Sequence, residues 1–417
     1  MRIGLLTYHC VPNFGAQLQA LSTVGYLRKK GHEPIVLNWY PKDLEDMYRN
    51  GRVSQAQFSC HDEFTNSMLP VSGLCRTEEE IIDEINRLHL DAILLGSDAL
   101  FKYHSLKELA QLQKDHTTPP PCEQFKGNPF FGGFLDKLAK RVPAAVYSVS
   151  SQDCRYKLMS RMERQQFALA FKNFCFISVR DEWTRKMVEY ITGCPNVKIF
   201  PDPVFGFNLN ASLDLIPSKE DIAKKFGLSK RYVLLSFSGH YANDTYVKSL
   251  GDELEKNGFQ PVALPLPELL FGCGIKKCID LPLNPLDWYA LIAHSDGFIG
   301  ERMHPIVVSL HNNVPFFCFD EYGTLRKKYF ARKKFWKPKN YVDYSTSKSY
   351  HIIKKANLLE NWFSYSKQEI LPSPTFVTNC IIGFDKDRCM SFSESCLMEY
   401  QEGMALVLRS LEDNLSC

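Results

Sequence analysis

Short apolar runs alternate with amphipathic stretches of helical period along the first half of the chain. Thr77 followed by Glu80 is typical of a capping box at a helix start, and Gly31 marks the end of the first predicted helix. Strands that alternate with helices favour a parallel sheet covered by helices on both faces. The pattern predicts strands at 2–8, 34–40, 91–96, 144–150, 175–180 and 197–201, and helices near 15–30, 77–89, 160–173 and 182–192.

Residues 201–217 interrupt this alternation, which then restarts with a helix from Ser218. A chain of 417 residues is long for one hydrophobic core. We therefore predict an α/β protein of two doubly wound domains joined near 205–217, and we expect ligands beyond the carboxyl ends of the strands, in the cleft between the domains. The restarted pattern predicts strands at 232–238, 260–264, 297–300 and 315–320, with helices near 244–257 and 285–294 and a further helix that carries Ile306, Val307 and Leu310.

The predicted domains span 1–205 and 218–345. Residues 346–417 form a C-terminal extension in which the region 340–390 has no clear pattern. The last predicted helix, near 393–413, is a candidate to return to the first domain.

Composition excludes several classes of protein. The net charge of +3 is too small to indicate nucleic-acid binding. No apolar run approaches the roughly 18 residues of a membrane span, and residues 1–8 have the pattern of a first strand and not of a signal peptide, so we expect a cytoplasmic protein. The closest cysteine pairs, Cys273 with Cys278 and Cys389 with Cys396, lack the spacing of metal sites, so we expect free thiols and no metal.

The segment Gly300-Glu301-Arg302-Met303-His304-Pro305 runs from a short strand directly into a helix. Proline is tolerated in a first helical turn, and the residue before a proline disfavours helical geometry, so we expect His304 on the connecting turn. A helix N-terminus with Arg302 beside it suits a phosphate or carboxylate, and His304 adds a titratable proton donor. The alternative is a surface arginine and a histidine packed at a turn.

Two further groups of polar residues follow predicted strands of the first domain. Asn13 and Gln17 come after the first strand and suit sugar hydroxyls, or they only cap the turn. Ser97 and Asp98 end another strand, where Asp98 is placed to accept a proton from a substrate hydroxyl or to cap the next element. Because the chain has neither a Gly-x-Gly-x-x-Gly fingerprint here nor a phosphate loop, nicotinamide and ATP chemistry lose support.

Arg180 also closes a predicted strand. Its guanidinium suits a substrate carboxylate or phosphate, or pairs structurally with Asp181 or Glu182. In the second domain, Ser238 and His240 follow the first strand, in a loop that faces the cleft in many two-domain transferases. A surface or packing role is the alternative for His240.

A basic and aromatic segment, 326–341, has eight Lys or Arg residues between Arg326 and Lys339 and no acidic residue there. Such a segment suits an anionic membrane surface or a lipid-diphosphate head group. A solvated face with a few packed aromatics is the alternative. Nothing else in the chain supports nucleic acid as a partner.

Taken together, these motifs resemble the polysaccharide pyruvyl transferase family over roughly residues 1–325. The resemblance implies two Rossmann-like domains in a glycosyltransferase-B-like arrangement, the first binding the acceptor and the second the donor, phosphoenolpyruvate. It also implies that Arg302 binds phosphoenolpyruvate, that His304 is catalytic and that Arg180 binds substrate, whereas Glu301 and Pro305 depart from the family pattern. The motifs that carry the resemblance, in the family's order, are 2–8, 13–20, 95–98, 177–181, 295–304 and 313–316.

The implied reaction transfers the pyruvyl group to a sugar of a surface-polysaccharide precursor as a cyclic ketal and releases phosphate. His304 is the natural acid for the methylene carbon and Asp98 a base for the sugar hydroxyl; no metal and no cofactor is expected. The acceptor is expected to be a sugar or lipid-linked oligosaccharide at the inner membrane face, which 326–341 would contact. Two alternatives remain open: a sugar-nucleotide-dependent glycosyltransferase of the same fold, and a non-catalytic polysaccharide- or lipid-binding module.

Overall fold

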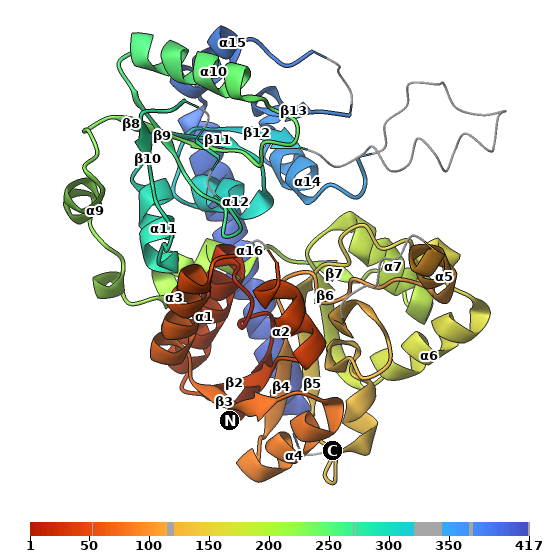
Figure 1. The fold of residues 1–417 in the computed structure, drawn as a ribbon. Coiled ribbons are helices and arrows are strands. Elements are labelled where there is room, and N and C mark those ends of the chain that lie inside the picture. The colour runs from red at the N-terminus through yellow and green to blue at the C-terminus, as the bar shows by residue number, and fades with distance from the viewer. Residues whose placement is uncertain are drawn as a thin grey trace, which may run out of the picture. The chain divides into compact units, whose positions relative to one another are not determined.

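The computed structural model describes residues 1–51, 53–114, 121–269, 271–272, 274–320, 344–366 and 370–415. The chain forms two compact units, one of Met1–Leu213 with Cys396–Cys417 and one of Asp214–Ser395, each built on its own sheet (Figure 1). The basic and aromatic segment 326–341 lies outside the described residues, so the membrane contact predicted for it stays a prediction.

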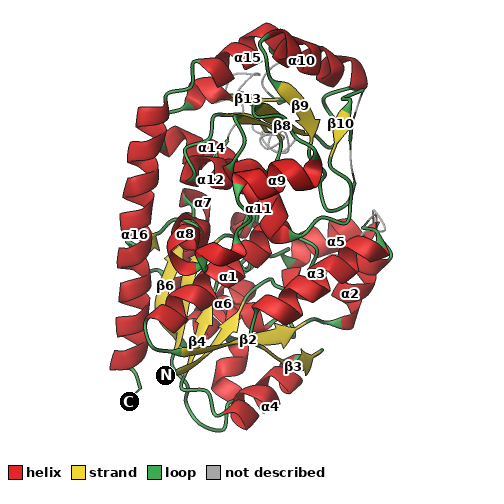
Figure 2. Ribbon diagram, turned by 90° about the vertical axis from the view of Figure 1, so that its left-hand side faces the viewer, coloured by secondary structure: helices red, strands yellow, loops and turns green. Residues whose placement is uncertain are grey.

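The sheet of the first unit has seven strands that all run parallel, in the order β3-β2-β1-β4-β5-β6-β7. Strands β1, β4 and β5 are almost wholly buried, because helices flank the sheet (Figure 2). The strand order reverses between β1 and β4, and the carboxyl ends of strands at such a point are the usual ligand site. The strands are β1 (Arg2–Leu6), β2 (Glu33–Trp39), β3 (Val71–Cys75), β4 (Ala92–Leu95), β5 (Ala144–Val149), β6 (Phe174–Val179) and β7 (Lys198–Ile199).

The helices of this unit begin at recognisable caps. Thr77 and Glu80 form the predicted capping box of α4, and Gly31, with a φ of 80°, follows the C-cap of α1. The helices are α1 (Phe14–Lys29), α2 (Lys42–Arg49), α3 (Gln55–Met68), α4 (Glu78–Leu88), α5 (Leu106–Lys114), α6 (Arg161–Phe171), α7 (Glu182–Thr192) and α8 (Phe207–Asn210), with short 3₁₀ turns between them.

The last helix, α16 (Lys386–Asp413), belongs to the second unit up to Ser395 and to the first from Cys396 onward. Within the first unit, the buried Tyr400 hydroxyl accepts a hydrogen bond from the Asn210 amide at 2.7 Å. The Tyr400 ring also lies edge-on to Tyr26, at 5.7 Å between centroids. The end of the chain therefore contributes to the core of the unit in which the chain begins.

The second unit repeats the same topology with six parallel strands in the order β10-β9-β8-β11-β12-β13. The order reverses between β8 and β11. The strands are β8 (Tyr232–Ser236), β9 (Gln260–Ala263), β10 (Lys277–Cys278), β11 (Gly297–Gly300), β12 (Phe316–Asp320) and β13 (Trp362–Ser364), and the helices are α9 (Lys219–Phe226), α10 (Asp244–Lys256), α11 (Pro285–Ala293), α12 (Met303–His311), α14 (Lys348–Lys355) and α15 (Pro374–Ile382).

The predicted fold class is confirmed, since the two parallel sheets are those of two Rossmann-like units. Helix α3 and strand β3 are among the elements that had no counterpart in the prediction, which also lacked α2, α5, α14, α15, β10 and β13. The buried face of α3 includes Gln57, His61 and Thr65 beside its phenylalanines, so no apolar stripe marks it in the sequence. Strand β3 lies at the sheet edge and leaves Gly73 and Leu74 exposed, which removes the apolar run of a buried strand.

Within the described part of the chain, none of the helices combines the length and the apolar character that a membrane crossing needs.

Candidate functional site

The reversal of strand order in the second unit lies between β8 and β11, where the segment around Arg302 begins. Gly300 ends β11 directly beside β8. A Cβ atom on Gly300 would lie 2.3 Å from the carbonyl oxygen of Ser236, so only glycine permits this close approach. Glu301 and Arg302 therefore leave the sheet at the position where doubly wound sheets bind ligands.

Helix α12 begins at Met303, with Arg302 as its N-cap in a positive-φ conformation of 78°. The prediction that His304 lies on the connecting turn is wrong, because His304 is the second residue of the helix. The chain enters the helix through the turn at Arg302, two residues earlier than Pro305 suggested. Pro305 still falls in the first turn, where its missing N–H removes no helical hydrogen bond.

Arg302 is half exposed, with 50% of its side chain accessible. Its Nη2 lies 3.6 Å from Oε1 of Glu268, a partly exposed carboxylate in the segment that follows β9. His304 is half-buried in the first turn of α12. The N-terminus of α12 therefore has an accessible guanidinium and an imidazole beside it, both from one short segment.

Glu301, in contrast, is 4% exposed and points into the protein. Its Oε2 accepts the backbone N–H of Ser238 at 2.9 Å, and its Oε1 accepts the hydroxyl of Tyr365 at 3.0 Å. Burial and the Glu301 charge together raise the pKa of Tyr365. Glu301 lies beside the candidate anion site, but two internal donors hold its carboxylate. Through these bonds it joins the ends of β8, β11 and β13.

Ser238 and His240 lie at the same edge of the second sheet as Arg302, in the loop after β8. The N–H of Ser238 is donated to Glu301, and its Oγ accepts the backbone N–H of the exposed His240 at 3.4 Å. The structure therefore brings four predicted residues, Arg302, His304, Ser238 and His240, to one edge of one sheet.

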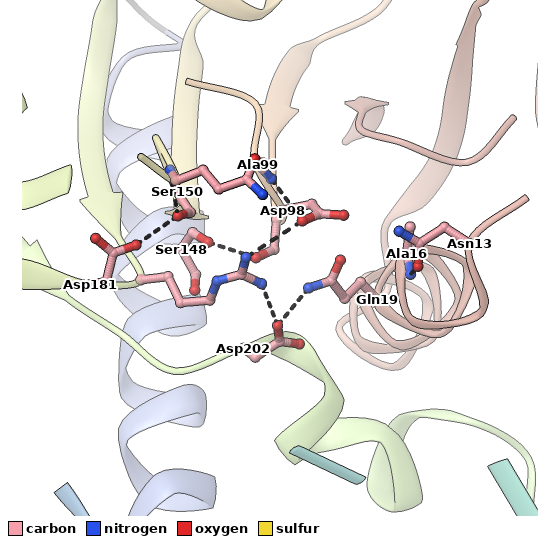
Figure 3. Close-up of polar contacts among 12 residues, drawn as sticks. Asn13, Ala16, Gln19, Asp98, Ala99, Ser148, Ser150, Asp181 and Asp202 are labelled. Atoms are coloured by element: carbon pink, nitrogen blue, oxygen red, sulfur yellow. Dashed lines mark hydrogen bonds and ion pairs between the residues drawn. The ribbon is translucent and has the colours of Figure 1, made fainter. Parts of the chain in front are cut away.

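In the first unit, Arg180 follows β6 and lies between two carboxylates (Figure 3). Its Nη1 is 2.6 Å from Oδ2 of Asp202, and its Nη2 is 3.4 Å from Oδ1 of Asp98. Burial opposes the charge of Arg180, but the neighbouring carboxylates outweigh it and raise its pKa. Asp181 does not hold this guanidinium directly; it caps α7 by accepting the N–H of Thr184 at 2.7 Å.

Asp202 and Gln19 belong to this candidate site and were not predicted from the sequence. Gln19 Nε2 donates to Oδ2 of Asp202 at 2.5 Å, across 183 positions of the chain. Figure 3 shows Gln19, Asp98 and Asp202 converging from separate segments. An aspartate between two prolines directly after a predicted strand was the available signal, because it places a carboxylate at the same sheet edge as Arg180.

Asp98 follows β4 with a φ of 91°, a conformation that few residues other than glycine adopt. Its Oδ1 accepts the N–H of Ala99 at 2.8 Å, and its carbonyl oxygen accepts the N–H of Ser150 at 2.8 Å. Ser97 is fully buried and donates its hydroxyl to the carbonyl of Ser148 at 2.6 Å. These hydrogen bonds fix the conformation of the turn after β4, in which Ser97 and Asp98 are both buried.

Asn13 and Gln17 make contacts within the protein. Asn13 caps α1 by accepting the N–H of Ala16 at 3.2 Å, which matches the capping alternative. Gln17 is fully buried and donates its amide to the carbonyl of His61 at 3.0 Å and the hydroxyl of Thr65 at 2.9 Å. Gln17 therefore joins α1 to α3.

No cluster of three or more His, Cys, Asp and Glu side chains arranged as metal ligands occurs in the described ranges.

A family model described as polysaccharide pyruvyl transferase matches residues 13–321, well over half of the chain. The chain belongs to the polysaccharide pyruvyl transferase family. Members of this family are transferases that act on polysaccharide, and the match includes Asp98, Arg180, Arg302 and His304. None of the curated proteins has a sequence that matches this one.

Solved structures that resemble the chain share little of its sequence. They include the UDP-GlcNAc 2-epimerase from Methanocaldococcus jannaschii, with 10% identity, 94% of this chain and 92% of that one covered, and a TM-score of 0.45. The spinosyn rhamnosyltransferase SpnG has 11% identity, covers 99% of this chain and 100% of its own, and has a TM-score of 0.47. The S. aureus MnaA–UDP structure has 10% identity, coverages of 94% and 91%, and a TM-score of 0.46. The assignment of the fold rests on the two parallel sheets themselves.

Proposed function

We propose that this pyruvyl transferase family member moves the pyruvyl group of phosphoenolpyruvate onto two hydroxyls of a sugar, forming a cyclic ketal and releasing phosphate. The observation that carries the proposal is the accessible guanidinium of Arg302 at the N-terminus of α12, with His304 in the first turn of that helix. These groups lie where the strand order of the second sheet reverses, the usual ligand position of such sheets.

Donor binding needs positive charge and N–H donors. The phosphate or carboxylate of phosphoenolpyruvate would accept bonds from Arg302 and from backbone N–H groups at the start of α12. The contact of Arg302 with Glu268 is a partly exposed ion pair 3.6 Å long, which is weak and readily exchanged for a ligand.

His304 is proposed as the acid and Asp98 as the base. His304 gives a proton to the methylene carbon of phosphoenolpyruvate, whose central carbon then forms a bond to a sugar oxygen while Asp98 takes the hydroxyl proton. The second hydroxyl then attacks the same carbon, and the bond between that carbon and the phosphate oxygen breaks. The proton of the second hydroxyl leaves with the phosphate. Arg180 is proposed to act on substrate together with Asp98, which it contacts at 3.4 Å.

The acceptor is proposed to be a sugar of a surface-polysaccharide precursor, carried on a lipid at the inner face of the plasma membrane. Reversing the charges of Lys327, Lys328, Lys333 and Lys334 in the segment 326–341 is expected to weaken binding to anionic liposomes. Unchanged binding would remove the membrane contact from the proposal.

No metal is required in this proposal, so a chelator is expected to leave the rate of phosphate release unchanged. Abolished turnover would refute that part.

The test is phosphate release from phosphoenolpyruvate with galactose-, mannose- and N-acetylhexosamine-containing acceptors. Release that depends on the acceptor and is lost in His304→Ala is the expected result. His294→Ala is the matched control, because His294 lies before the amino end of β11 and contacts the carbonyl of Pro217 at 3.0 Å. If no phosphate is released, calorimetry with phosphoenolpyruvate distinguishes two explanations. Binding of the donor would indicate that the correct acceptor was missing, and no binding would indicate that the proposed reaction is wrong. Thermal protection by uridine diphosphate but not by phosphoenolpyruvate would support a glycosyltransferase instead.

A further inference from the structure

Two carboxylates share one guanidinium at the carboxyl edge of the first sheet. Asp202 is 2.6 Å from Arg180 and its side chain is completely buried, whereas Asp98 is 3.4 Å away and its side chain is 10% exposed. One positive charge cannot neutralise both carboxylates fully. The shorter contact indicates that Arg180 pairs mainly with Asp202.

Asp202 holds this contact with help from neutral donors. Its Oδ2 also accepts the amide of Gln19 at 2.5 Å, and its Oδ1 accepts the N–H of Val204 at 3.0 Å. A buried carboxylate is stable only when such donors satisfy its oxygens. Gln19 lies on α1 and Asp202 opens a 3₁₀ turn after β7, so the two positions are fixed by different elements.

A general base must be able to bind a proton, and a tight ion pair with an arginine lowers its affinity for one. A carboxylate engaged in a close fork with arginine is stabilised in its charged form and takes a proton reluctantly. Of the two carboxylates that contact Arg180, Asp98 is the farther, at 3.4 Å against 2.6 Å for Asp202, and its Oδ1 also accepts the neutral N–H of Ala99 at 2.8 Å.

We propose that Asp202 and Gln19 are positioning residues that draw Arg180 toward the interior and so leave Asp98 able to accept the proton of the acceptor hydroxyl. This inference rests on the proposed function, in which Asp98 is the base. It adds two residues that do not touch the reacting atoms and act through Arg180.

The decisive variant is Asp202→Asn, which keeps the shape of the side chain and removes its charge. Arg180 is then expected to bind Asp98 closely. We expect the turnover number for acceptor-dependent phosphate release to fall about tenfold, part of the roughly hundredfold or more that a general base contributes. The dissociation constant of phosphoenolpyruvate, measured by calorimetry, is expected to stay within about twofold, since the donor is proposed to bind the second unit.

Glu163→Gln is the matched control. Glu163 is a buried carboxylate of the same unit that accepts the Tyr103 hydroxyl at 2.7 Å and the Leu106 N–H at 2.8 Å, and its partners in the described part of the chain do not include Arg180. Its substitution removes one buried negative charge without changing Arg180. Equal turnover in Asp202→Asn and Glu163→Gln would overturn the inference, provided that the wild type releases phosphate.

Two further measurements keep the inference testable if Asp202→Asn folds poorly or the wild type shows no turnover. Gln19→Met removes only the amide donor and is expected to lower turnover in the same direction, by less than Asp202→Asn. Independently of activity, Asp202→Asn is expected to lower the thermal midpoint more than Asp98→Asn does. Equal midpoints would show that Arg180 does not favour Asp202, and the inference would fail even if the reaction were a different one.

Discussion

The carboxylate of Glu301 accepts the backbone N–H of Ser238 at 2.9 Å, joining the ends of β8 and β11 where the strand order reverses. The same carboxylate accepts the hydroxyl of Tyr365 at 3.0 Å. Arg302 is the next residue along the chain, so the position of the candidate anion site depends on the buried side chain that joins these strand ends.

Replacing Glu301 by alanine is expected to destabilise the second unit by about 2–6 kcal/mol, because two internal donors lose their acceptor and each costs about 1–3 kcal/mol when buried. Tyr365→Phe removes one of the two bonds and is expected to cost about 1 kcal/mol. Urea unfolding followed by circular dichroism measures both. Equal stability of Glu301→Ala and Tyr365→Phe would contradict a role for the Ser238 contact.

Arg302→Ala is expected to weaken phosphoenolpyruvate binding by about 10- to 100-fold, the loss of one charge-assisted interaction. Glu268→Gln is expected to tighten binding by up to about fivefold, because a competing exposed ion pair is worth about 0.2–1 kcal/mol. Calorimetry gives both constants. The control is Arg231→Ala. Arg231 lies at the amino end of β8 and its guanidinium stacks on the ring of Phe259 at 4.3 Å, whereas Arg302 follows the carboxyl end of β11. Identical constants for the two arginine variants would argue against the site.

Gly300→Ala is expected to destabilise the second unit by about 1–3 kcal/mol or more, the cost of forcing extra atoms into a packed region. Its Cβ would lie 2.3 Å from the backbone oxygen of Ser236, which has little room to move. Because Arg302 follows two residues later, the affinity for phosphoenolpyruvate should fall as well. Gly133→Ala is the control, as no atom lies within 4 Å of that added carbon. A Gly300→Ala variant as stable as Gly133→Ala would disprove the close approach of β8 and β11.

Burial lowers the pKa of His61 from 6.5 to about 4. Below about pH 6.5 the unfolded chain binds a proton that the folded chain excludes, so the free energy of unfolding falls as the pH drops toward about 4. The full loss is about 3 kcal/mol, and it should be smaller in His61→Asn. Urea unfolding of the two proteins between pH 7 and 4.5 measures the difference.

His89→Asn is the control for that pH series. His89 is exposed and has a φ of 50°, a conformation that asparagine tolerates. It is the surface substitution against which the slope of the His61→Asn curve is compared. Parallel curves for His61→Asn and the wild type would show that His61 does not titrate differently on folding.

Much of the fold was predictable because its elements are encoded locally. The capping box at Thr77 and Glu80 and the apolar runs of the buried parallel strands lie within single windows of sequence. The arginine and histidine of α12 were also predictable, since one hexapeptide contains the strand end, the turn and the helix start. The helix start itself was misplaced, because the positive φ of Arg302 cannot be deduced from the proline three residues later.

The sequence by itself determined that two doubly wound units form and that Asp98, Arg180 and Arg302 follow strand ends. Only the tertiary structure decided which partners these residues have. Arg180 binds Asp202 more closely than Asp98, and Asp202 is completed by Gln19, 183 positions away. Side-chain pairing over such separations depends on the order of the strands within the sheet and on which carboxylate is buried most deeply. No local pattern of residues encodes either property.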